Sequence, residues 1–279
     1  MSSAKAGTLF LVSTPIGNLG DMSHRAVEVL SSAALIIAED TRHSRRLLDH
    51  YKIATPLSSY HEHNEAKETP RLVARLQTGD SIALISDAGT PLISDPGSRL
   101  VDAAVAAGVP VVPIPGPSAV MAALVASGMS LERFTFFGFL PRKGKERTEM
   151  IADVVASQAT SVLFEAPSRV GATLEALVEA GAGERAAVVA RELTKQFEEF
   201  KRGTVADLSR IYKDADPRGE VVLVIAGAPR PIVTEHELSD AAAQLRASGK
   251  APRDVMDHLV SALGAPRNLA YKIAHEGVS

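Results

Sequence analysis

The residues that could do chemistry gather first in one stretch, Ala83 to Gly97, which reads ALISDAGTPLISDPG. An apolar run typical of a buried β-strand ends at Asp87, and a loop with two glycines and two prolines follows it. Small residues let a ligand approach the backbone, and free amides with a carboxylate can hold its polar groups. The residues Ser94-Asp95-Pro96 then predict the start of a helix, a polar cap followed by proline. A tight structural turn would also explain this stretch, but the ends of strands are where open α/β sheets bind ligands.

Two further segments place polar side chains after predicted strands. The segment Glu39-Asp40-Thr41-Arg42 lies where a strand passes into a helix, and capping accounts for Asp40 or Thr41 but not for Glu39 and Arg42. We therefore predict substrate contacts for those two residues.

The second segment, Tyr60 to Glu65, follows a predicted short strand and contains His61, His63 and Asn64. An ordinary solvent-exposed loop would explain the polar side chains of this segment. The functional hypothesis is that they contact RNA or transfer a proton. A His-x-His metal pair is conceivable, but without cysteine or a further clear ligand we predict no metal site.

A basic loop lies between Phe139 and Arg147 and contains Arg142, Lys143, Lys145 and Arg147. A run of charges is usually a solvated face. In a chain whose net charge is −3, however, phosphate contacts require a local basic patch of this kind. We therefore favour RNA contact for this loop.

Charged residues also gather at two later strand ends, namely Glu165, Arg169, Arg191, Glu192 and Lys195. Internal salt bridges would account for all five. Their expected place beside a ligand cleft makes Glu165 and Lys195 additional candidates for catalysis.

The composition bounds what these residues can belong to. The chain has 279 residues, 46% of them hydrophobic and 23% charged, which is typical of a globular protein long enough for two domains. It has no cysteine, which excludes disulfides, thiolate metal sites and a cysteine nucleophile. No apolar stretch is long enough to span a bilayer, and residues 1–7 lack the apolar core of a signal peptide, so we expect a cytoplasmic protein without membrane contact.

Strand-like and helix-like runs alternate along most of the chain, which predicts a mainly parallel sheet with crossover helices. The predicted strands of a first unit are 8–13, 35–38, 82–86 and 109–114, and its helices are 23–30, 41–50, 66–76 and 96–107. The loop after the first strand, Ser13 to Asp21, contains two glycines but lacks the G-x-G-x-x-G spacing, and no phosphate-binding P-loop occurs. An ordinary NAD or ATP site is therefore disfavoured.

A second α/β unit and a helical tail follow. The segment Ile114 to Ser118 ends the first unit, and Ser118 is the expected N-cap of the next helix. Later strands are predicted at 134–139, 161–164, 187–191 and 221–225, an antiparallel addition at 197–201, and helices at 146–156, 168–180 and 205–212. Three short helices are predicted at 235–247, 252–263 and 266–275. We expect domains at 1–116 and 117–229 and a helical tail at 230–279, which packs on the second domain or forms a helix-turn-helix-like module.

Eight motifs in order give a resemblance to a known family. They are TPIGNL from Thr14, EDTR from Glu39, SYHEHNE from Ser59, DAGTPLISDPG from Asp87, IPGPSA from Ile114, FLPRKGKER from Phe139, FEAPSR from Phe164 and ARELTK from Ala190. Together they resemble the ribosomal RNA ribose methyltransferases that are similar to the tetrapyrrole methylases, the class III S-adenosylmethionine methyltransferases. The resemblance covers about residues 9–227, and the helical tail also resembles that of the family.

The resemblance implies two α/β domains that bind S-adenosylmethionine in the cleft between them, a small helical extension and a homodimer. It also implies 2′-O-methylation of a cytidine ribose in 16S ribosomal RNA, free or within the 30S subunit. Carried onto this chain, the cofactor would meet Pro15, Asp87, Gly89, Thr90, Ile93, Ser118, Ala119, Phe164, Leu193 and Gly227.

The other two groups of expected site residues combine the motifs with the residue types. The candidates for catalysis are Glu39, Asp87, Glu165 and Lys195. The candidates for RNA binding are Arg42, His61, His63, Asn64, Arg142, Lys143, Lys145, Arg147 and Arg169. Two alternatives keep the fold but change the function: carbon methylation of a tetrapyrrole, or RNA binding without catalysis in ribosome assembly.

Overall fold

The computed structural model describes residues 6–215, 218–229 and 234–275 of the chain. The chain forms two units, Met1–Gly227 and Ala228–Ser279, and each is described by itself. Among the described residues, no helix combines the length and the apolar character needed to cross a membrane.

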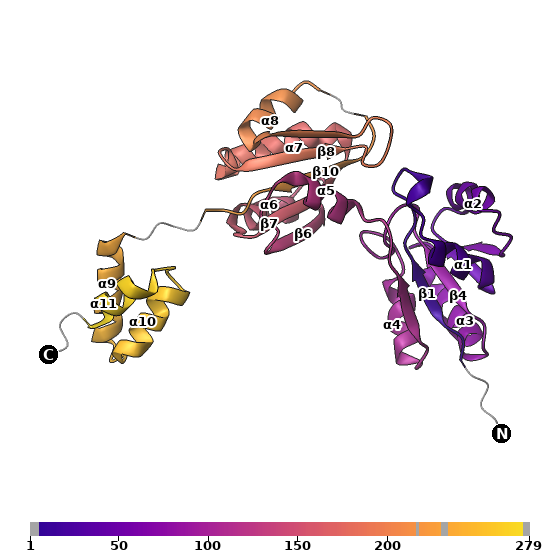
Figure 1. The fold of residues 1–279 in the computed structure, drawn as a ribbon, viewed down its shortest axis with the longest axis horizontal. Coiled ribbons are helices and arrows are strands. Elements are labelled where there is room, and N and C mark those ends of the chain that lie inside the picture. Colours follow the sequence, from indigo (N-terminus) through magenta and orange to yellow (C-terminus); the bar gives the residue numbers. More distant parts are fainter. Residues whose placement is uncertain (1–5, 216–217, 230–233, 276–279) are drawn as a thin grey trace. The chain divides into compact units, whose positions relative to one another are not determined.

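The first sheet consists of five parallel strands in the order β3-β2-β4-β1-β5. Figure 1 labels two of its strands, β1 and β4. The strands are β1 (Leu9–Val12), β2 (Leu35–Ala38), β3 (Leu57–Ser59), β4 (Ile82–Ile85) and β5 (Val111–Ile114). Because all five strands point the same way, the loops that follow them meet at one edge of the sheet. That edge carries the polar motifs that follow β1, β2 and β4.

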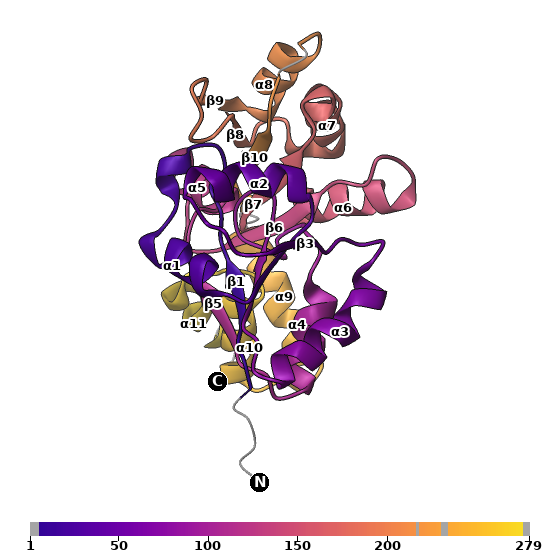
Figure 2. The same ribbon diagram turned by 90° about the vertical axis from the view of Figure 1, so that its right-hand side faces the viewer.

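Helices cover both faces of this sheet, which is why its central strands are apolar throughout. They are α1 (His24–Ser32), α2 (Thr41–His50), α3 (Glu65–Gln77) and α4 (Ser98–Ala106), and a 3₁₀ turn, η1 (Leu19–Asp21), precedes α1. One core cluster joins α1 and α2 to the sheet through Leu30 and Leu48, and another joins α3 and α4 through Leu76 and Leu100. Figure 2 shows α3 and α4 side by side.

The second sheet is mixed, in the order β6-β7-β10-β8-β9. Its strands are β6 (Phe134–Phe139), β7 (Thr160–Glu165), β8 (Ala186–Arg191), β9 (Glu199–Thr204) and β10 (Val221–Ile225). β6 and β7 are parallel, whereas β10 runs antiparallel to both of its neighbours and β9 runs antiparallel to β8. The expected antiparallel addition is thus present, but the central strand β10 is also reversed.

Helices again cover both faces of the second sheet. One face carries α6 (Lys145–Ala156), α7 (Val170–Leu177) and α8 (Val205–Tyr212), with the short turns η2 (Pro167–Arg169) and η3 (Val178–Ala182) beside α7. The other face carries α5 (Ala119–Ser127). Ser118 caps α5 as predicted, because its side chain accepts a hydrogen bond from the Met121 amide.

The second unit contains α9 (Glu235–Ala247), α10 (Pro252–Ser261) and α11 (Arg267–His275). Leu238, Leu259 and Ile273 belong to its buried core, one residue from each helix. Thr234 forms a capping box with Glu237 at the start of α9. These helices match the three that the sequence predicts, within two residues at each end.

The predicted start of α4 is wrong. The helix begins at Ser98, and Gly97 with a φ of 134° is the residue before it. Ser94 has a φ of 69°, in the left-handed region, so Ser94-Asp95-Pro96 stays in the loop instead of capping the helix. The domain boundary expected after residue 116 stays a prediction, and the one expected after residue 229 adjoins residues 230–233, which lie outside the described residues.

Candidate active site

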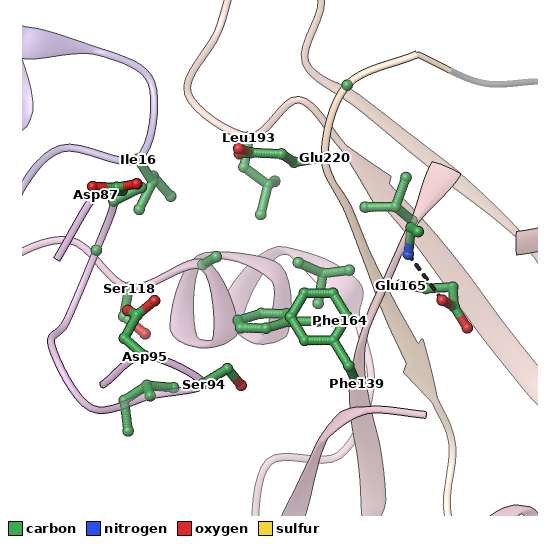
Figure 3. Close-up of a pocket in the computed structure, with 18 of the residues that line it drawn as sticks. Ile16, Asp87, Ser94, Asp95, Ser118, Phe139, Phe164, Glu165, Leu193 and Glu220 are labelled. Atoms are coloured by element: carbon green, nitrogen blue, oxygen red, sulfur yellow. Dashed lines mark hydrogen bonds between the residues drawn. The ribbon is translucent and has the colours of Figure 1, made fainter. Parts of the chain in front are cut away.

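A pocket of about 340 Å³ lies where the strand-end loops of the two sheets meet within the first unit (Figure 3). The first sheet contributes Ile16, the loop after β4 and the start of α5. The second sheet contributes the ends of β6 and β7, Leu193 after β8, and the residues that lead into β10. The pocket therefore combines loops from segments that are far apart in the sequence.

The loops of the first sheet are fastened to one another by backbone hydrogen bonds. Thr14 and Gly89 form an antiparallel bridge, with N–O distances of 2.9 and 3.0 Å. Gly89 has a φ of 82°, and a Cβ atom there would lie 3.2 Å from Cγ2 of Ile16. The Thr90 hydroxyl donates to the carbonyl oxygen of Pro117 at 3.1 Å. This side of the pocket is consequently rigid, and it exposes backbone rather than long side chains.

Aromatic rings form the opposite wall. The Phe164 ring lies with its centroid 4.9 Å from that of Phe136 and 5.4 Å from that of Phe139. Figure 3 shows Phe164 and Phe139 side by side at the wall of the cavity. An apolar wall facing a backbone-lined wall suits a flat, uncharged heterocycle such as a purine base.

Two apolar side chains of the pocket share an unusual backbone setting. Ile93 lies between Leu92 and Ser94, whose φ angles are 71° and 69°. Leu193 lies between Glu192 and Thr194, whose φ angles are 53° and 65°. Residues other than glycine are uncommon in this conformation, and such strain concentrates at binding sites. Both loops thus hold a single apolar side chain in the pocket at a cost in backbone energy.

Two carboxylates of the first sheet line the pocket, Asp87 and Asp95. Burial raises the pKa of Asp95 to about 6, and the nearby charges of Glu39 and Asp87 act in the same direction. The pKa of Glu39 is also raised, by burial and then by Asp87. Asp87 accepts a hydrogen bond from the Asp40 amide at 3.2 Å, so the loop after β2 is tied to the loop after β4.

Glu165 is engaged by other protein groups, which argues against the catalytic role expected for it. Its side chain is fully buried, its Oε1 lies 3.2 Å from Arg169 Nε, and its Oε2 accepts from the Thr173 hydroxyl at 2.6 Å. Its Oε1 also accepts from the Ala166 amide, the bond drawn in Figure 3. Arg147 donates to the same Thr173 hydroxyl at 3.1 Å. A carboxylate with these three partners, one of them a cation, holds β7 to α7 and is poorly suited to accept a substrate proton.

Lys195 is likewise engaged. Its Nζ lies 2.8 Å from Glu192 Oε1 and 3.1 Å from Glu220 Oε2. Burial lowers the pKa of Lys195, but the hydrogen bonds to the two carboxylates outweigh burial and the pKa is raised overall. A lysine that stays protonated is unsuited to accept a proton. The aliphatic part of Lys195 packs against Gly17, where a Cβ atom would lie 2.4 Å from Lys195 Cγ. This contact between Gly17 and Lys195 holds the loop after β1 against the loop after β8.

Most of the residues expected at the cofactor do lie around one pocket. They are Asp87, Gly89, Thr90, Ile93, Ser118, Ala119, Phe164 and Leu193. Pro15 is not among the lining residues, although its neighbour Ile16 is. The position expected for Gly227 is wrong: β10 runs antiparallel to β7, so its last residue, Ile225, pairs with Ser161 at the far end of the sheet. The residues before β10, Gly219 and Glu220, take that place in the pocket.

The residues expected to bind RNA fall into three settings. Arg42 is exposed and pairs with Asp40 at 3.0 Å, and Arg142, Lys143 and Lys145 are exposed on the basic loop. The second setting is the segment after β3. There the ring centroids of His61 and His63 lie 5.9 Å apart, and the Asn64 side chain accepts a hydrogen bond from the His61 amide at 2.9 Å.

The third setting is structural. Arg169 donates to the carbonyl oxygens of Leu140 and Pro141, at 2.7 and 3.1 Å, and Arg147 donates to the Pro141 carbonyl at 3.2 Å. These two arginines bind the carbonyl groups at the start of the basic loop, so the exposed cations of the loop are Arg142, Lys143 and Lys145. Within the described residues, no three His, Asp or Glu side chains come together as a metal ion would require.

Several residues that line the pocket are absent from the sequence-based set, among them Asp95, Phe139 and Glu220. Asp95 and Phe139 lie inside motifs that the sequence had already marked, and the misread helix start concealed the first of them. No sequence signal locates Glu220, because its place depends on the direction of β10.

Residues 8–209 match the family of Tetrapyrrole (Corrin/Porphyrin) Methylases. A uroporphyrin-III-C-methyltransferase from Thermus thermophilus has the same fold, with a TM-score of 0.57 at 22% identity over 79% of this chain and 94% of that chain. The same kind of enzyme from that organism complexed with S-adenyl homocysteine gives a TM-score of 0.56 at 14% identity, over 79% of this chain and 97% of that chain. The chain belongs to the tetrapyrrole methylase family, and the expected fold class is confirmed.

Two sequence relatives carry a more particular name, ribosomal RNA small subunit methyltransferase I. The protein of that name from Synechocystis sp. is 46% identical over 273 residues, which are 97% of this chain and 98% of the relative. That from Mesorhizobium japonicum is 50% identical over 245 residues, 86% of this chain and 83% of the relative. The resemblance seen in the motifs is therefore confirmed over nearly the whole chain.

Proposed function

We propose that this protein transfers the methyl group of S-adenosylmethionine to the 2′-hydroxyl of a cytidine ribose in 16S ribosomal RNA. The observation that carries this proposal is a pocket fit for the methyl donor in a chain that matches a small-subunit rRNA methyltransferase along nearly its full length. The names of these relatives favour RNA over a tetrapyrrole as the substrate.

The pocket suits S-adenosylmethionine, which would supply an activated methyl group. The aromatic wall at Phe164 would face the adenine, and the loop after β4, which the Thr14–Gly89 bridge fixes in place, would meet its polar edges with backbone groups. A Cβ at Gly89 would fill the space beside Ile16, so this position keeps the cradle open. Ile93 and Leu193, held by their left-handed neighbours, would flank the donor from the two sheets.

Methylation of a hydroxyl requires alignment of the attacking oxygen, exclusion of water and removal of a proton. The apolar walls exclude water. For the proton, we propose the carboxylates of the first sheet, Asp87 and Asp95 with Glu39 behind them, and not Glu165 or Lys195. Of these carboxylates, Asp95 has the pKa best suited to accept the proton. A carboxylate whose pKa is about 6 is mostly ionised at neutral pH and is a stronger base than an ordinary aspartate.

We propose that the RNA lies across the exposed basic loop and the segment after β3. The cations Arg142, Lys143 and Lys145 would contact phosphates, and His61, His63 and Asn64 would meet the nucleotide beside Glu39. The electrostatic influence of His61 on Glu39 supports their closeness. The substrate would be the 16S rRNA itself or the 30S subunit that contains it.

We further propose a cytoplasmic homodimer. The helix α5 supports a second copy as partner, because Met121 and Val125 lie one turn apart on it and are 48% and 67% exposed. Equilibrium sedimentation of the wild type and of Val125→Asp tests this. A monomeric wild type would refute it.

The methylation itself is tested with S-adenosylmethionine labelled in the methyl group. The protein is incubated with 16S rRNA or with 30S subunits that lack the modification, and the RNA is digested to nucleosides. We expect the label in 2′-O-methylcytidine. Label on a base, or transfer to uroporphyrinogen but not to RNA, would overturn the proposal.

A further inference from the structure

The residues that line the pocket all belong to the first unit, Met1–Gly227, and the comparisons separate the helical second unit from the rest of the chain. The matches to the two Thermus enzymes leave only 6% and 3% of those chains uncovered, too little for a counterpart of α9 to α11. The match to the Synechocystis relative covers 97% of this chain and must include the bundle. The bundle therefore accompanies relatives named for ribosomal RNA and not these methylases of a small tetrapyrrole.

Helix α11 has two different faces. Ala270, Ile273 and Ala274 are buried in the core of the bundle. The other face is exposed and consists of Arg267, Asn268, Tyr271, Lys272 and His275. With 3.6 residues per turn, positions 267, 271 and 275 follow one another along the helix, and 268 and 272 lie beside them. The five side chains form one continuous stripe, which we call the α11 stripe.

The α11 stripe has the chemistry of a nucleic-acid contact. It combines two cations, an amide and an exposed aromatic ring, and no residue of α11 is acidic. Tyr271 is 59% exposed, and its ring lies with its centroid 4.2 Å from that of His275 at an interplanar angle of 31°, so the two rings already stack. Exposed aromatic rings stack on unpaired bases, and arginine contacts phosphates.

One of the two cations of the α11 stripe has an acidic neighbour. Glu235 of α9 lies 3.8 Å from Lys272 Nζ. Both side chains of that pair are about two-thirds exposed, so water and salt weaken their attraction. Arg246 of α9 adds a further cation nearby, since it donates to the carbonyl oxygen of Ile273 on α11. The two cations favour an anionic partner over a basic or apolar protein surface, and the exposed ring of Tyr271 favours single-stranded RNA among anionic partners.

We infer that the α11 stripe is a second RNA-binding surface, which holds single-stranded nucleotides of the small-subunit rRNA. This inference rests on the proposed rRNA substrate, and it identifies the surface of the helical unit that binds that RNA. Arg267 and Lys272 contact phosphates, Tyr271 stacks on a base, and Asn268 provides hydrogen bonds. The role of the stripe is affinity, and it has none in the chemical step.

The test uses the full-length chain, with a 16S rRNA transcript and 30S subunits as probes. The double variant Arg267→Ala/Tyr271→Ala is expected to bind the RNA at least tenfold more weakly, and its salt dependence is expected to be less steep by about one released counterion. Its affinity for S-adenosylmethionine and its rate at saturating RNA are expected to be unchanged. Asn268→Asp, which leaves the core untouched, is expected to weaken RNA binding several-fold.

The matched control is Arg253→Ala, which removes an exposed cation from α10. We expect its RNA affinity within twofold of the wild type. The inference is overturned if the double variant binds RNA normally, if Arg253→Ala loses as much affinity, or if the double variant changes the oligomeric state instead. A wild type that binds the RNA without methylating it refutes the proposed function alone. A wild type that binds neither probe overturns both.

Discussion

Replacing Asp95 by asparagine should stabilise the protein above pH 6 while it impairs methyl transfer. Burial raises the pKa of this carboxyl from 3.8 to about 6, so the folded state holds the proton more tightly than the unfolded chain does. The ionised carboxylate therefore destabilises the fold, and this destabilising free energy is fully present above pH 6. It falls to about half at pH 5 and vanishes when the pH is well below 3.8. The shift corresponds to ~3 kcal/mol, which the solvent around a half-buried side chain reduces to ~1.5 kcal/mol.

The assay is thermal unfolding of wild type and Asp95→Asn at pH 8 and pH 5. We expect the variant to melt roughly 3–6 °C higher at pH 8 and about half as much higher at pH 5. Asp102→Asn, on the exposed side of the adjacent α4, should not shift the melting temperature at either pH. The reasoning is refuted if Asp95→Asn lowers the melting temperature at pH 8, or if its effect is the same at both values. Methyl transfer by the variant should fall at least tenfold at pH 7 if Asp95 accepts the ribose proton.

Three other substitutions separate support from binding. Glu165→Ala should lower the free energy of unfolding by about 1–3 kcal/mol in urea titrations, because it leaves the partly buried Arg169 and the buried Thr173 hydroxyl without their carboxylate partner; a loss below 1 kcal/mol would contradict the ion pair. Gly89→Ala should weaken S-adenosylmethionine binding in calorimetry at least tenfold, because the cradle needs a left-handed backbone and no Cβ; an unchanged Kd would contradict the placement of the donor. Arg142→Ala with Lys143→Ala should raise KM for RNA and flatten its salt dependence without altering KM for the methyl donor; a change in the donor KM alone would argue against RNA contact.

Much of the fold could be predicted because its signals are local. β2 and β6 have the predicted bounds, as has α2, since apolar runs and caps mark them directly. The start of α4 was misread because Asp95 and Pro96 resemble a helix start, whereas left-handed residues keep them in the loop. The direction of β10 depends on its neighbours and not on its own residues, so the sequence could not indicate that it is reversed.

The same distinction applies to the site. The loops that form the pocket were predictable, because carboxyl ends of parallel strands meet at one edge. The roles of single side chains were not. Glu165 and Lys195 had the residue types expected of catalysts, and only the coordinates show that Arg169, Thr173 and Glu192 already occupy them. Conversely, Asp95 attracted no catalytic role until its burial was known.

The paired left-handed residues around Ile93 and Leu193 have a consequence for how this protein can change. Glycine at Ser94 would relieve backbone strain there without removing an ion pair or a core contact, so selection for heat resistance alone has a route through this position. The relaxed loop would no longer hold Ile93 toward the pocket. A variant selected for heat resistance at this position would therefore bind the methyl donor less tightly.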